Sequence, residues 1–480
     1  MKKEAIDKQM SRRDFIGLSA KASLAATAAT IVPRHVLGGP GYIAPSDKIA
    51  LAMIGVGGQG NVDLRGFLPH AEVQVVAVAD PNKEQDYKGF YFSSMFPKAG
   101  TGPTSAYVDK HYSEQAGNSY KGCKAYADFR EMLEKEGDGI DACCVSTTDN
   151  VHAVAAMAAI KKGKHVYVQK PMTHDIYEAR MLAEAARQFN VVTQMGNQGQ
   201  AMEYIRLIRE WIQGGAIGDV VEVHSWTDRP FWPQGKDTDR PKETPEVPAT
   251  LDWDLWLGPA PMRSYHGIYV PFNWRGWWDF GTGSLGDMGC HILNIPAFAL
   301  DLADPVSVQG TTTPMNNETY PLSCMITYDF GPRGEMPPLR LYWYEGGLRP
   351  ARPKELDEQR KLETNGNLFI GTKGTILCGS NGEGVRLIPE SAMEAFKRPP
   401  KTLPRTPGIY EDFIRGIRGG PKPCSNFDVS GPLTEFTLMG NLAMKFPGEI
   451  LRWDAKNLKV TNLEEANQYV KRDYREGWAL

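Results

Sequence analysis

The stretch from Lys48 to Gly60 constrains the fold of this chain more than any other. Its first half, Ile49 to Ile54, is apolar without alternation, which is typical of a parallel strand buried on both faces. Glycines then follow in the spacing G-x-G-x-x-G, which allows a tight turn, a close approach of a pyrophosphate and close packing of a helix on the strand. The stretch therefore predicts a dinucleotide-binding turn. Its predicted binding residues are Gly55, Gly57, Gly58, Gln59 and Gly60.

A second apolar run, Val73 to Ala79, ends in Asp80, at about the 20-residue distance where a ribose-binding carboxylate is expected. A carboxylate at this position repels a 2′-phosphate, so the expected cofactor is NAD rather than NADP. Lys83, just beyond it, keeps NADP as the alternative. Glycine turns followed by an acid also occur in loops that bind nothing.

Composition excludes several classes of protein. The chain has 480 residues, 41% hydrophobic and 23% charged, which suits two or three globular domains. Its formal net charge of −3 shows no excess of positive charge that could bind phosphates, so nucleic acid is not an expected partner. The seven cysteines contain no C-x-x-C pair and predict neither a disulfide framework nor a zinc site, and no metal is expected.

The N-terminus resembles a twin-arginine export signal. Ser11 to Gly17 carries paired arginines and is followed by an alanine-rich, mildly apolar tract. We therefore expect residues 1–45 to be a signal and tether, the twin-arginine machinery to be a partner, and the protein to be periplasmic or otherwise exported. The alternative is a basic tail on a cytoplasmic protein. Beyond the membrane there is no pool of free NAD, so an exported protein would have to keep its cofactor and regenerate it in place.

The pattern of elements predicts two domains. Residues 46–196 alternate strands and helices, which favours an α/β Rossmann domain with a doubly wound parallel sheet. Residues 197–480 contain several β-rich segments without regular helices between them, which indicates an α+β domain with a large, open, mainly antiparallel sheet. The stretch 81–122 is longer than an ordinary connection and is expected to be an insertion, as a lid, a subunit contact or a surface loop with its own small core.

Polar residues follow the strand predicted over Ile140 to Val145. Ligands of doubly wound sheets lie at the carboxyl ends of the strands, so Thr147, Asn150 and His152 are expected to line the nicotinamide side of the cleft. A helix is expected to begin near His152. Capping of this helix is the alternative role for each polar residue taken alone.

Further along the chain, Lys170 follows the next predicted strand within Gln169-Lys-Pro171. Asp287 and His291 are spaced i and i+4, so they share one helix face; the alternative is a helix-terminal acid beside a buried histidine. Asp287 and His291 as metal ligands lack further ligands in the sequence. Aromatic faces can stack on sugar rings, although tryptophans also serve as packing. The candidates for the substrate cleft are Asn197, Arg229, Trp232, Trp274 and Arg275.

With these motifs the chain resembles the glucose–fructose oxidoreductase / inositol dehydrogenase (Gfo/Idh/MocA) family. The matching features are GVGGQG at 55–60, QKP at 169–171 in place of the family's usual E-K-P, and D-x-x-x-H within GDMGCH at 286–291. The resemblance implies a bound NAD(P) and a carbohydrate-like substrate between the two domains. It also implies that Lys170 binds cofactor and substrate hydroxyl, that His291 is the general base, and that Asp287 orients the substrate or the imidazole.

These features together predict an exported oxidoreductase that transfers hydride between a ring carbinol of a sugar, polyol or glycoside and a tightly bound nicotinamide. A histidine of near-neutral pKa suits the removal of the hydroxyl proton. Two alternatives remain: an NAD-dependent glycoside hydrolase that works by transient oxidation, elimination and addition of water, and a non-catalytic sugar-binding protein. An exposed sheet face commonly becomes a subunit interface, so a homo-oligomer through the C-terminal sheet is expected.

Overall fold

The computed structural model describes residues 43–117 and 119–480, so the twin-arginine-like segment lies outside the described residues. A short 3₁₀ helix, Pro45–Asp47, precedes the first strand. Residues Ile49–Leu480 form one compact unit that contains both large sheets. Within the described ranges, no helix is long and apolar enough to cross a membrane.

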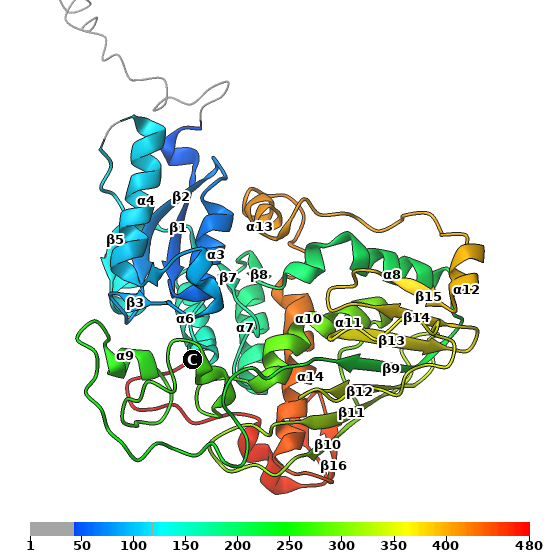
Figure 1. Ribbon diagram of the computed structural model, residues 1–480. Coiled ribbons are helices and arrows are strands. Elements are labelled where there is room, and N and C mark those ends of the chain that lie inside the picture. Colours follow the sequence, from blue (N-terminus) through cyan, green and yellow to red (C-terminus); the bar gives the residue numbers. More distant parts are fainter. Residues whose placement is uncertain (1–42, 118) are drawn as a thin grey trace, which may run out of the picture. The chain divides into compact units, whose positions relative to one another are not determined.

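The first sheet has six strands, all paired in parallel, in the order β5-β2-β1-β6-β7-β8 (Figure 1). Its strands are β1 (Ile49–Ile54), β2 (Val73–Ala79), β5 (Lys124–Tyr126), β6 (Ala142–Val145), β7 (His165–Val168) and β8 (Thr193–Met195). The strand order reverses between β1 and β6, and a doubly wound sheet binds its ligand at such a switch point. The predicted Rossmann fold is confirmed.

Five helices accompany these strands: α3 (Gly58–Phe67), α4 (Thr101–Ala116), α5 (Phe129–Lys135), α6 (Asp149–Lys161) and α7 (Ile176–Gln188). The helix expected near His152 begins earlier, at Asp149, with Thr148 as its N-cap residue. Asn150 and His152 therefore lie within its first turns. Helix α7 begins with a capping box in which Asp175 and Glu178 each accept a hydrogen bond from the other's backbone N–H.

The expectation of one insertion over 81–122 is wrong in its second half. Residues 81–100 do form a small separate core, with a two-stranded hairpin of β3 (Gln85–Asp86) and β4 (Lys98–Ala99) and a 3₁₀ turn (Tyr91–Ser94). Residues 101–116 instead form α4, the ordinary crossover helix between β2 and β5. Its Gly102 and Pro103 resemble a loop in the sequence, yet proline is tolerated in the first turn of a helix.

The second sheet has nine strands in the order β15-β14-β13-β9-β12-β11-β10-β16-β17, and every pair is antiparallel except β9 with β12. The strands are β9 (Val220–Trp226), β10 (Ser307–Thr312), β11 (Cys324–Phe330), β12 (Leu339–Tyr344), β13 (Gly366–Gly371), β14 (Thr375–Cys378), β15 (Arg386–Ile388), β16 (Ile450–Asp454) and β17 (Lys459–Val460). The mainly antiparallel sheet is therefore confirmed.

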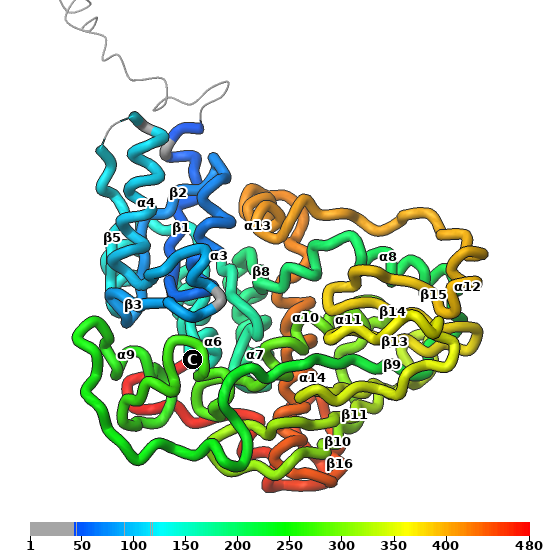
Figure 2. The backbone as a smooth tube through the Cα atoms, in the orientation of Figure 1, coloured from blue at the N-terminus to red at the C-terminus, as the bar shows by residue number. Residues whose placement is uncertain are grey.

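The helices of this part are α8 (Glu203–Gln213), α9 (Trp253–Leu257), α10 (Cys290–Ile292), α11 (Asn294–Leu300), α12 (Glu390–Ala395), α13 (Ile409–Ile417) and α14 (Phe427–Met444). Helix α14 is buried along most of its length and packs on both α7 and β10, so a single core joins the two sheets (Figure 1). The C-terminal segment returns to the Rossmann helices (Figure 2). There the backbone oxygen of Leu480 accepts a hydrogen bond from Lys161.

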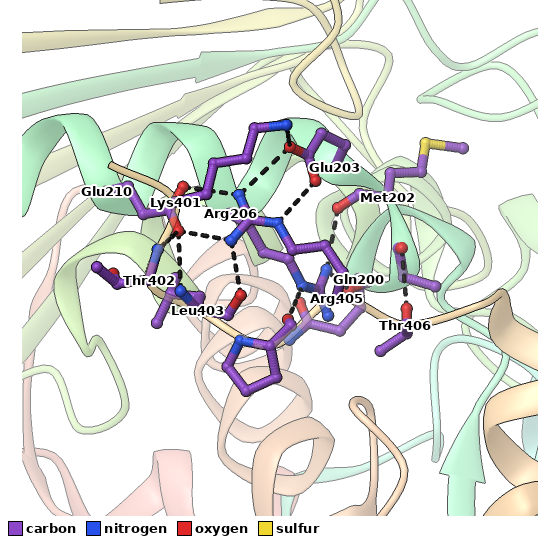
Figure 3. Close-up of polar contacts among 12 residues, drawn as sticks. Gln200, Met202, Glu203, Arg206, Glu210, Lys401, Thr402, Leu403, Arg405 and Thr406 are labelled. Carbon is purple, nitrogen blue, oxygen red and sulfur yellow. Dashed lines mark hydrogen bonds and ion pairs between the residues drawn. The ribbon is translucent and has the colours of Figure 1, made fainter. Parts of the chain in front are cut away.

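The segment between α12 and α13 is held on α8 by charged side chains (Figure 3). Arg405 donates to both Glu203 and Glu210, and Arg206 donates to the Pro404 carbonyl at 2.7 Å. Helix α13 then packs into the core of the six-stranded sheet, where Phe413 lies against Tyr167. A segment distant in sequence thus completes the Rossmann core. The domain boundary predicted after residue 196 stays a prediction.

Candidate functional site

An open cavity lies at the carboxyl ends of β1, β2 and β6, and the empty space in it and in its solvent-filled mouth is about 1050 Å³. The glycine turn forms one wall, and at Gly55 and Gly60 the backbone leaves no room for a side chain. Gly55 has a φ of +83°, and a Cβ there would lie 2.6 Å from the Ser146 backbone. A Cβ on Gly60 would lie 2.1 Å from the Gly55 carbonyl oxygen. Of the predicted cofactor residues, Gly55, Gly57, Gly58, Gln59, Asp80 and Thr147 line the cavity.

Asp80 lies in this cavity at the end of β2. One carboxylate oxygen accepts the Val56 N–H and the other accepts the Asn82 N–H, each at 2.8 Å. Burial raises the pKa of Asp80 to about 6, against the opposing effect of the two backbone donors. The carboxylate is therefore mainly ionised at neutral pH and suits the hydroxyls of a ribose.

Two aromatic residues of the cavity come from the 81–100 segment and were not predicted as site residues. The Tyr87 hydroxyl accepts the Gly58 N–H at 2.8 Å, which leaves its own proton free to be donated into the cavity. Phe92 packs so close to Gly58 that a Cβ on that glycine would lie 2.4 Å from the ring. The sequence shows many Tyr and Phe residues in this stretch, but no pattern in it indicates which of them face the cavity.

A roof over the cavity comes from outside the Rossmann strands and helices. Its lining residues are Leu255, Trp256, Val270, Pro271, Phe272, Trp274, Arg275 and Trp478. Backbone hydrogen bonds join the roof to the loop after β2: the Lys83 N–H donates to Thr250 O at 2.7 Å, and the Asp252 N–H donates to Pro81 O at 2.8 Å. Because these bonds run from one wall to the roof, the cavity is closed over part of its length. Trp274 and Arg275, predicted for the substrate cleft, thus line the cofactor cavity.

Lys170 and Asp287 meet, although they are 117 positions apart in sequence. The Lys170 Nζ donates to Asp287 Oδ1 at 2.8 Å and to the Asp287 backbone carbonyl at 3.0 Å. Arg229 and Arg275 each place a guanidinium nitrogen 3.5 Å from the same carboxylate. Burial would raise the pKa of Asp287, but the charges of Lys170, Arg275 and Arg229 outweigh it and hold that pKa well below its usual range. One carboxylate therefore faces three cations.

Asp287 is presented by a π-helical turn, Leu285–Gly289, that leads into α10 with His291. Such turns are rare and are frequent at functional sites. The turn packs tightly, because a Cβ on Gly286 would lie 1.9 Å from Thr282 Oγ1. Thr282 in turn donates its N–H and its hydroxyl to Asp149 on α6, at 3.0 and 2.6 Å. The Rossmann helix thereby anchors the turn that carries Asp287.

His291 lies within the electrostatic reach of Lys170 and Asp287. Burial, and then the charge of Lys170, lower the pKa of His291 to about 3, so the ring is neutral at neutral pH. The near-neutral pKa expected from the sequence is therefore corrected. Its Nδ1 is buried without a hydrogen-bond partner. Across residues 43–117 and 119–480, no three His, Cys, Asp or Glu side chains form a group that could hold a metal ion.

Not all predicted site residues line the cavity, and three of those that do not are bonded to other parts of the protein. The Asn150 side chain donates to Leu257 O at 2.9 Å and so holds the roof helix. His152 is buried, and its Nδ1 lies 2.7 Å from Pro171 O, which ties α6 to the Lys170 turn. Trp232 is also buried and donates to Gln234 at 2.7 Å. Asn150 Oδ1 and His152 Nε2 are buried without a hydrogen-bond partner, and direct contact of these three residues with a ligand stays a prediction.

Two other residues predicted for the substrate cleft, Arg229 and Asn197, have polar groups that are not fully used within the protein. Arg229 approaches Asp287 and stacks over the exposed ring of Phe231, 4.3 Å from its centroid. Asn197 follows β8 and is fully buried, yet neither atom of its side-chain amide has a hydrogen-bond partner. Buried amides are normally bonded, so Asn197 stays a candidate for a role at the site.

Two family models match the chain. Residues 104–197 match the NAD-binding Rossmann fold, and residues 202–331 the C-terminal alpha/beta domain, of the oxidoreductase family named GFO_IDH_MocA. The two matched regions include Lys170, Asp287 and His291.

Curated relatives match over parts of their length. The 1,5-anhydro-D-fructose reductase of Ensifer adhaerens is 26% identical over 175 residues, which cover 35% of this chain and 41% of that protein. A glycosyl hydrolase family 109 protein of Shewanella pealeana is 24% identical over 234 residues, which cover 45% of this chain and 46% of that protein. The chain thus spans less than half the length of these relatives.

A solved structure shows the same fold over most of the chain. The WlbA dehydrogenase from Bordetella pertussis, in complex with NADH and UDP-GlcNAcA, aligns with a TM-score of 0.55 at 14% identity. The alignment covers 85% of this chain and 99% of that one. At this identity the likeness establishes the two-domain fold alone.

Proposed function

Because models of the GFO_IDH_MocA oxidoreductases match residues 104–197 and 202–331, we propose that the chain is a member of this family and that it transfers hydride between a ring carbinol of a carbohydrate-like substrate and a tightly bound NAD. The observation that carries the proposal is the 2.8 Å contact of Lys170 with Asp287, one helical turn before His291. Arg275 both contacts this cluster and lines the dinucleotide cavity, so the two parts of the site adjoin.

The chain's own residues suit the oxidation of a secondary alcohol. A bound nicotinamide supplies hydride acceptance and donation. Lys170 donates a hydrogen bond to the substrate oxygen, and its charge, with those of Arg229 and Arg275, favours the alkoxide that develops as the proton leaves. Neutral His291 accepts that proton, and the negative charge of Asp287 favours the imidazolium that results.

NAD is proposed over NADP because Asp80 faces the cavity as a mainly ionised carboxylate. Tight retention is proposed because Trp256, Trp274 and Trp478 cover the cavity, and the roof is hydrogen-bonded to the loop after β2. Retention suits the export that the arginine pair Arg12-Arg13 favours, since an exported enzyme would regenerate its cofactor in place.

A homo-oligomer through the outer face of the nine-stranded sheet is part of the proposal. Along β11, buried and half-buried residues alternate, so one face packs on helices and the other does not. Half-buried aromatic rings stack on that outer face, with His224 5.0 Å from Tyr342 and 5.9 Å from Tyr344 between ring centroids. A second copy of the chain would cover these rings.

The test begins with the purified native protein. Denaturation of one portion should release a stoichiometric nicotinamide nucleotide, identified by mass spectrometry. The native portion is mixed with methyl β-D-glucopyranoside, D-glucose, myo-inositol and 1,5-anhydro-D-fructose in turn. We expect at least one probe to change the near-ultraviolet absorbance of the bound nicotinamide. Release of no nucleotide and no response to any probe would contradict the proposal and favour a non-catalytic sugar-binding protein.

The glycoside hydrolase remains the second candidate, favoured by the similarity to the family 109 protein. It uses the same first step, so reduction of the nicotinamide alone does not distinguish the two. An aryl β-glucoside does: release of the phenol with no net reduction of the nucleotide supports hydrolysis. Reduction without release of the phenol supports the oxidoreductase.

A further inference from the structure

A buried carboxylate, Asp63, lies beneath the glycine turn on α3. Its side chain is fully buried, and none of the ion pairs found in residues 43–117 and 119–480 includes it. Burying a charge without a countercharge is costly unless several donors satisfy it. The side chains that donate hydrogen bonds to Asp63 should therefore explain why an acid occupies this position.

Four neutral side chains donate to Asp63, each from a different segment. Ser146, after β6, donates to one oxygen at 2.8 Å, and Tyr410, on α13, donates to the other at 3.0 Å. The Gln169 amide donates to both oxygens, at 2.9 and 3.0 Å, and Gln59 of the glycine turn completes the set at 3.2 Å. The carboxylate thus joins the loops that follow β1, β6 and β7.

Gln169 connects this carboxylate to Lys170. Its side chain is buried and packs so closely that a Cβ on Gly196 would lie 2.5 Å from Nε2. Because the amide nitrogen Nε2 points at Asp63, the amide oxygen Oε1 points the other way, toward the backbone of the next residue. It accepts a hydrogen bond from the Lys170 N–H, with 3.3 Å between nitrogen and oxygen. Lys170 then extends to Asp287 on the other lobe of the site.

We propose that Asp63 is a positioning residue for Lys170. Its carboxylate sets the orientation of the Gln169 amide, and that amide sets the direction in which the Lys170 turn leaves β7. The inference rests on the proposed function, because it explains how the ammonium that binds the substrate oxygen is aimed.

The proposal requires one acid and one amide at positions 63 and 169. A Gln169→Glu change would place two carboxylates about 3 Å apart, and one of them would have to take up a proton. An Asp63→Asn change would let two amides face each other in either orientation. Making both changes restores one acid and one amide with the roles exchanged, and the oxygen of the new amide at position 63 can still accept from Ser146 or Tyr410.

The experiment compares the wild type with D63N, Q169E and the double variant, using the probe sugar that gives the largest absorbance change. We expect each single variant to lose about 10- to 100-fold in the single-turnover rate of nicotinamide reduction with little change in nucleotide content, and the double variant to recover at least about tenfold. The matched control is Asp109→Asn, a carboxylate on α4 that accepts the Gly122 and Cys123 N–H groups away from the Lys170 turn.

A second measurement needs no turnover. Brief acetylation of native protein followed by peptide mass spectrometry should show faster labelling of Lys170 in both single variants, and wild-type labelling in the double variant. Unchanged single-turnover rates and unchanged labelling in the single variants would overturn the proposal. Losses that follow melting temperature and nucleotide content, without recovery in the double variant, would overturn it as well. A wild type that responds to no probe would count against the proposed function, while the labelling would still decide the role of Asp63.

Discussion

At the residue scale, the site depends on one carboxylate among three cations. Asp287 holds Lys170 at 2.8 Å and lies within 3.5 Å of Arg229 and Arg275. Such an excess of positive charge favours an alkoxide, but it also disfavours a proton on His291, whose pKa is lowered to about 3. Among these charges, that of Asp287 is the one that raises the pKa of His291.

An Asp287→Asn variant should therefore lose about 100- to 1000-fold in the rate of nicotinamide reduction, because both the aim of Lys170 and the stability of the imidazolium depend on that charge. Its nucleotide content should not change, since Asp287 does not line the cavity. Single-turnover absorbance measures the rate. Asp109→Asn, whose carboxylate accepts the Gly122 and Cys123 N–H groups, is the control, and equal rates in the two variants would contradict the role of Asp287.

The choice of cofactor should depend on pH through Asp80. Its pKa is raised to about 6, so the carboxylate is ionised above pH 6 and becomes neutral below it. Repulsion of a 2′-phosphate should weaken as the pH falls, so the ratio of NADP to NAD affinity should rise between pH 8 and pH 5. Reconstitution of the nucleotide-free protein with each cofactor measures the ratio. In Asp80→Asn the rise should be largely absent, and an equal rise there would assign it to another group.

At the element scale, the roof is expected to set how long the cofactor stays bound. Trp274→Ala removes an aromatic face from the cavity wall and the stacking partner of Arg275, whose guanidinium lies 4.2 Å from the ring centroid. We expect nucleotide release to become about tenfold faster, a change of about 1.4 kcal/mol. Exchange with isotopically labelled NAD, followed by mass spectrometry, measures the rate. Trp453→Ala, on β16 and away from the cavity, should leave release unchanged.

The π-helical turn should tolerate no side chain at Gly286. A methyl group there would collide with Thr282, whose side chain is bonded to Asp149, so Gly286→Ala should lower the free energy of unfolding by about 1–3 kcal/mol. Gly137→Ala is the matched control, because a Cβ at that glycine meets nothing within 4 Å. Its effect should stay within about 0.5 kcal/mol in chemical denaturation. Equal effects of the two substitutions would contradict the tight packing of the turn.

The elements that could be predicted from the sequence are those specified by local pattern. The strand into the glycine turn and Asp80 were found because each is a short-range motif. The meeting of Lys170 with Asp287 was expected only through the family resemblance. The roof could not be predicted, because residues 250–275 are mostly irregular and reach the cavity through contacts distant in sequence. Likewise, no local pattern distinguishes Asn150, a roof anchor, from Thr147, a cavity residue.

At the scale of the whole molecule, the outer face of the nine-stranded sheet is expected to join subunits. Tyr342→Glu places a charge among the stacked rings of His224 and Tyr344 and should convert the oligomer to monomers. Light scattering coupled to size-exclusion chromatography measures the mass. Val429→Glu, an equally drastic change at an exposed position on α14, is the control. A wild type that is already monomeric would rule out this interface.

The whole account depends on a nicotinamide held in the cavity and reduced by a sugar at the Lys170 and His291 cluster. In the most direct measurement, the native protein is mixed with methyl β-D-glucopyranoside that carries deuterium on its ring carbons. The protein is then denatured, and the mass of the released nucleotide is measured by mass spectrometry. We predict a reduced nucleotide that carries one deuterium. Release of a nucleotide without deuterium, after native mass spectrometry has shown the glycoside bound, would contradict hydride transfer at this site.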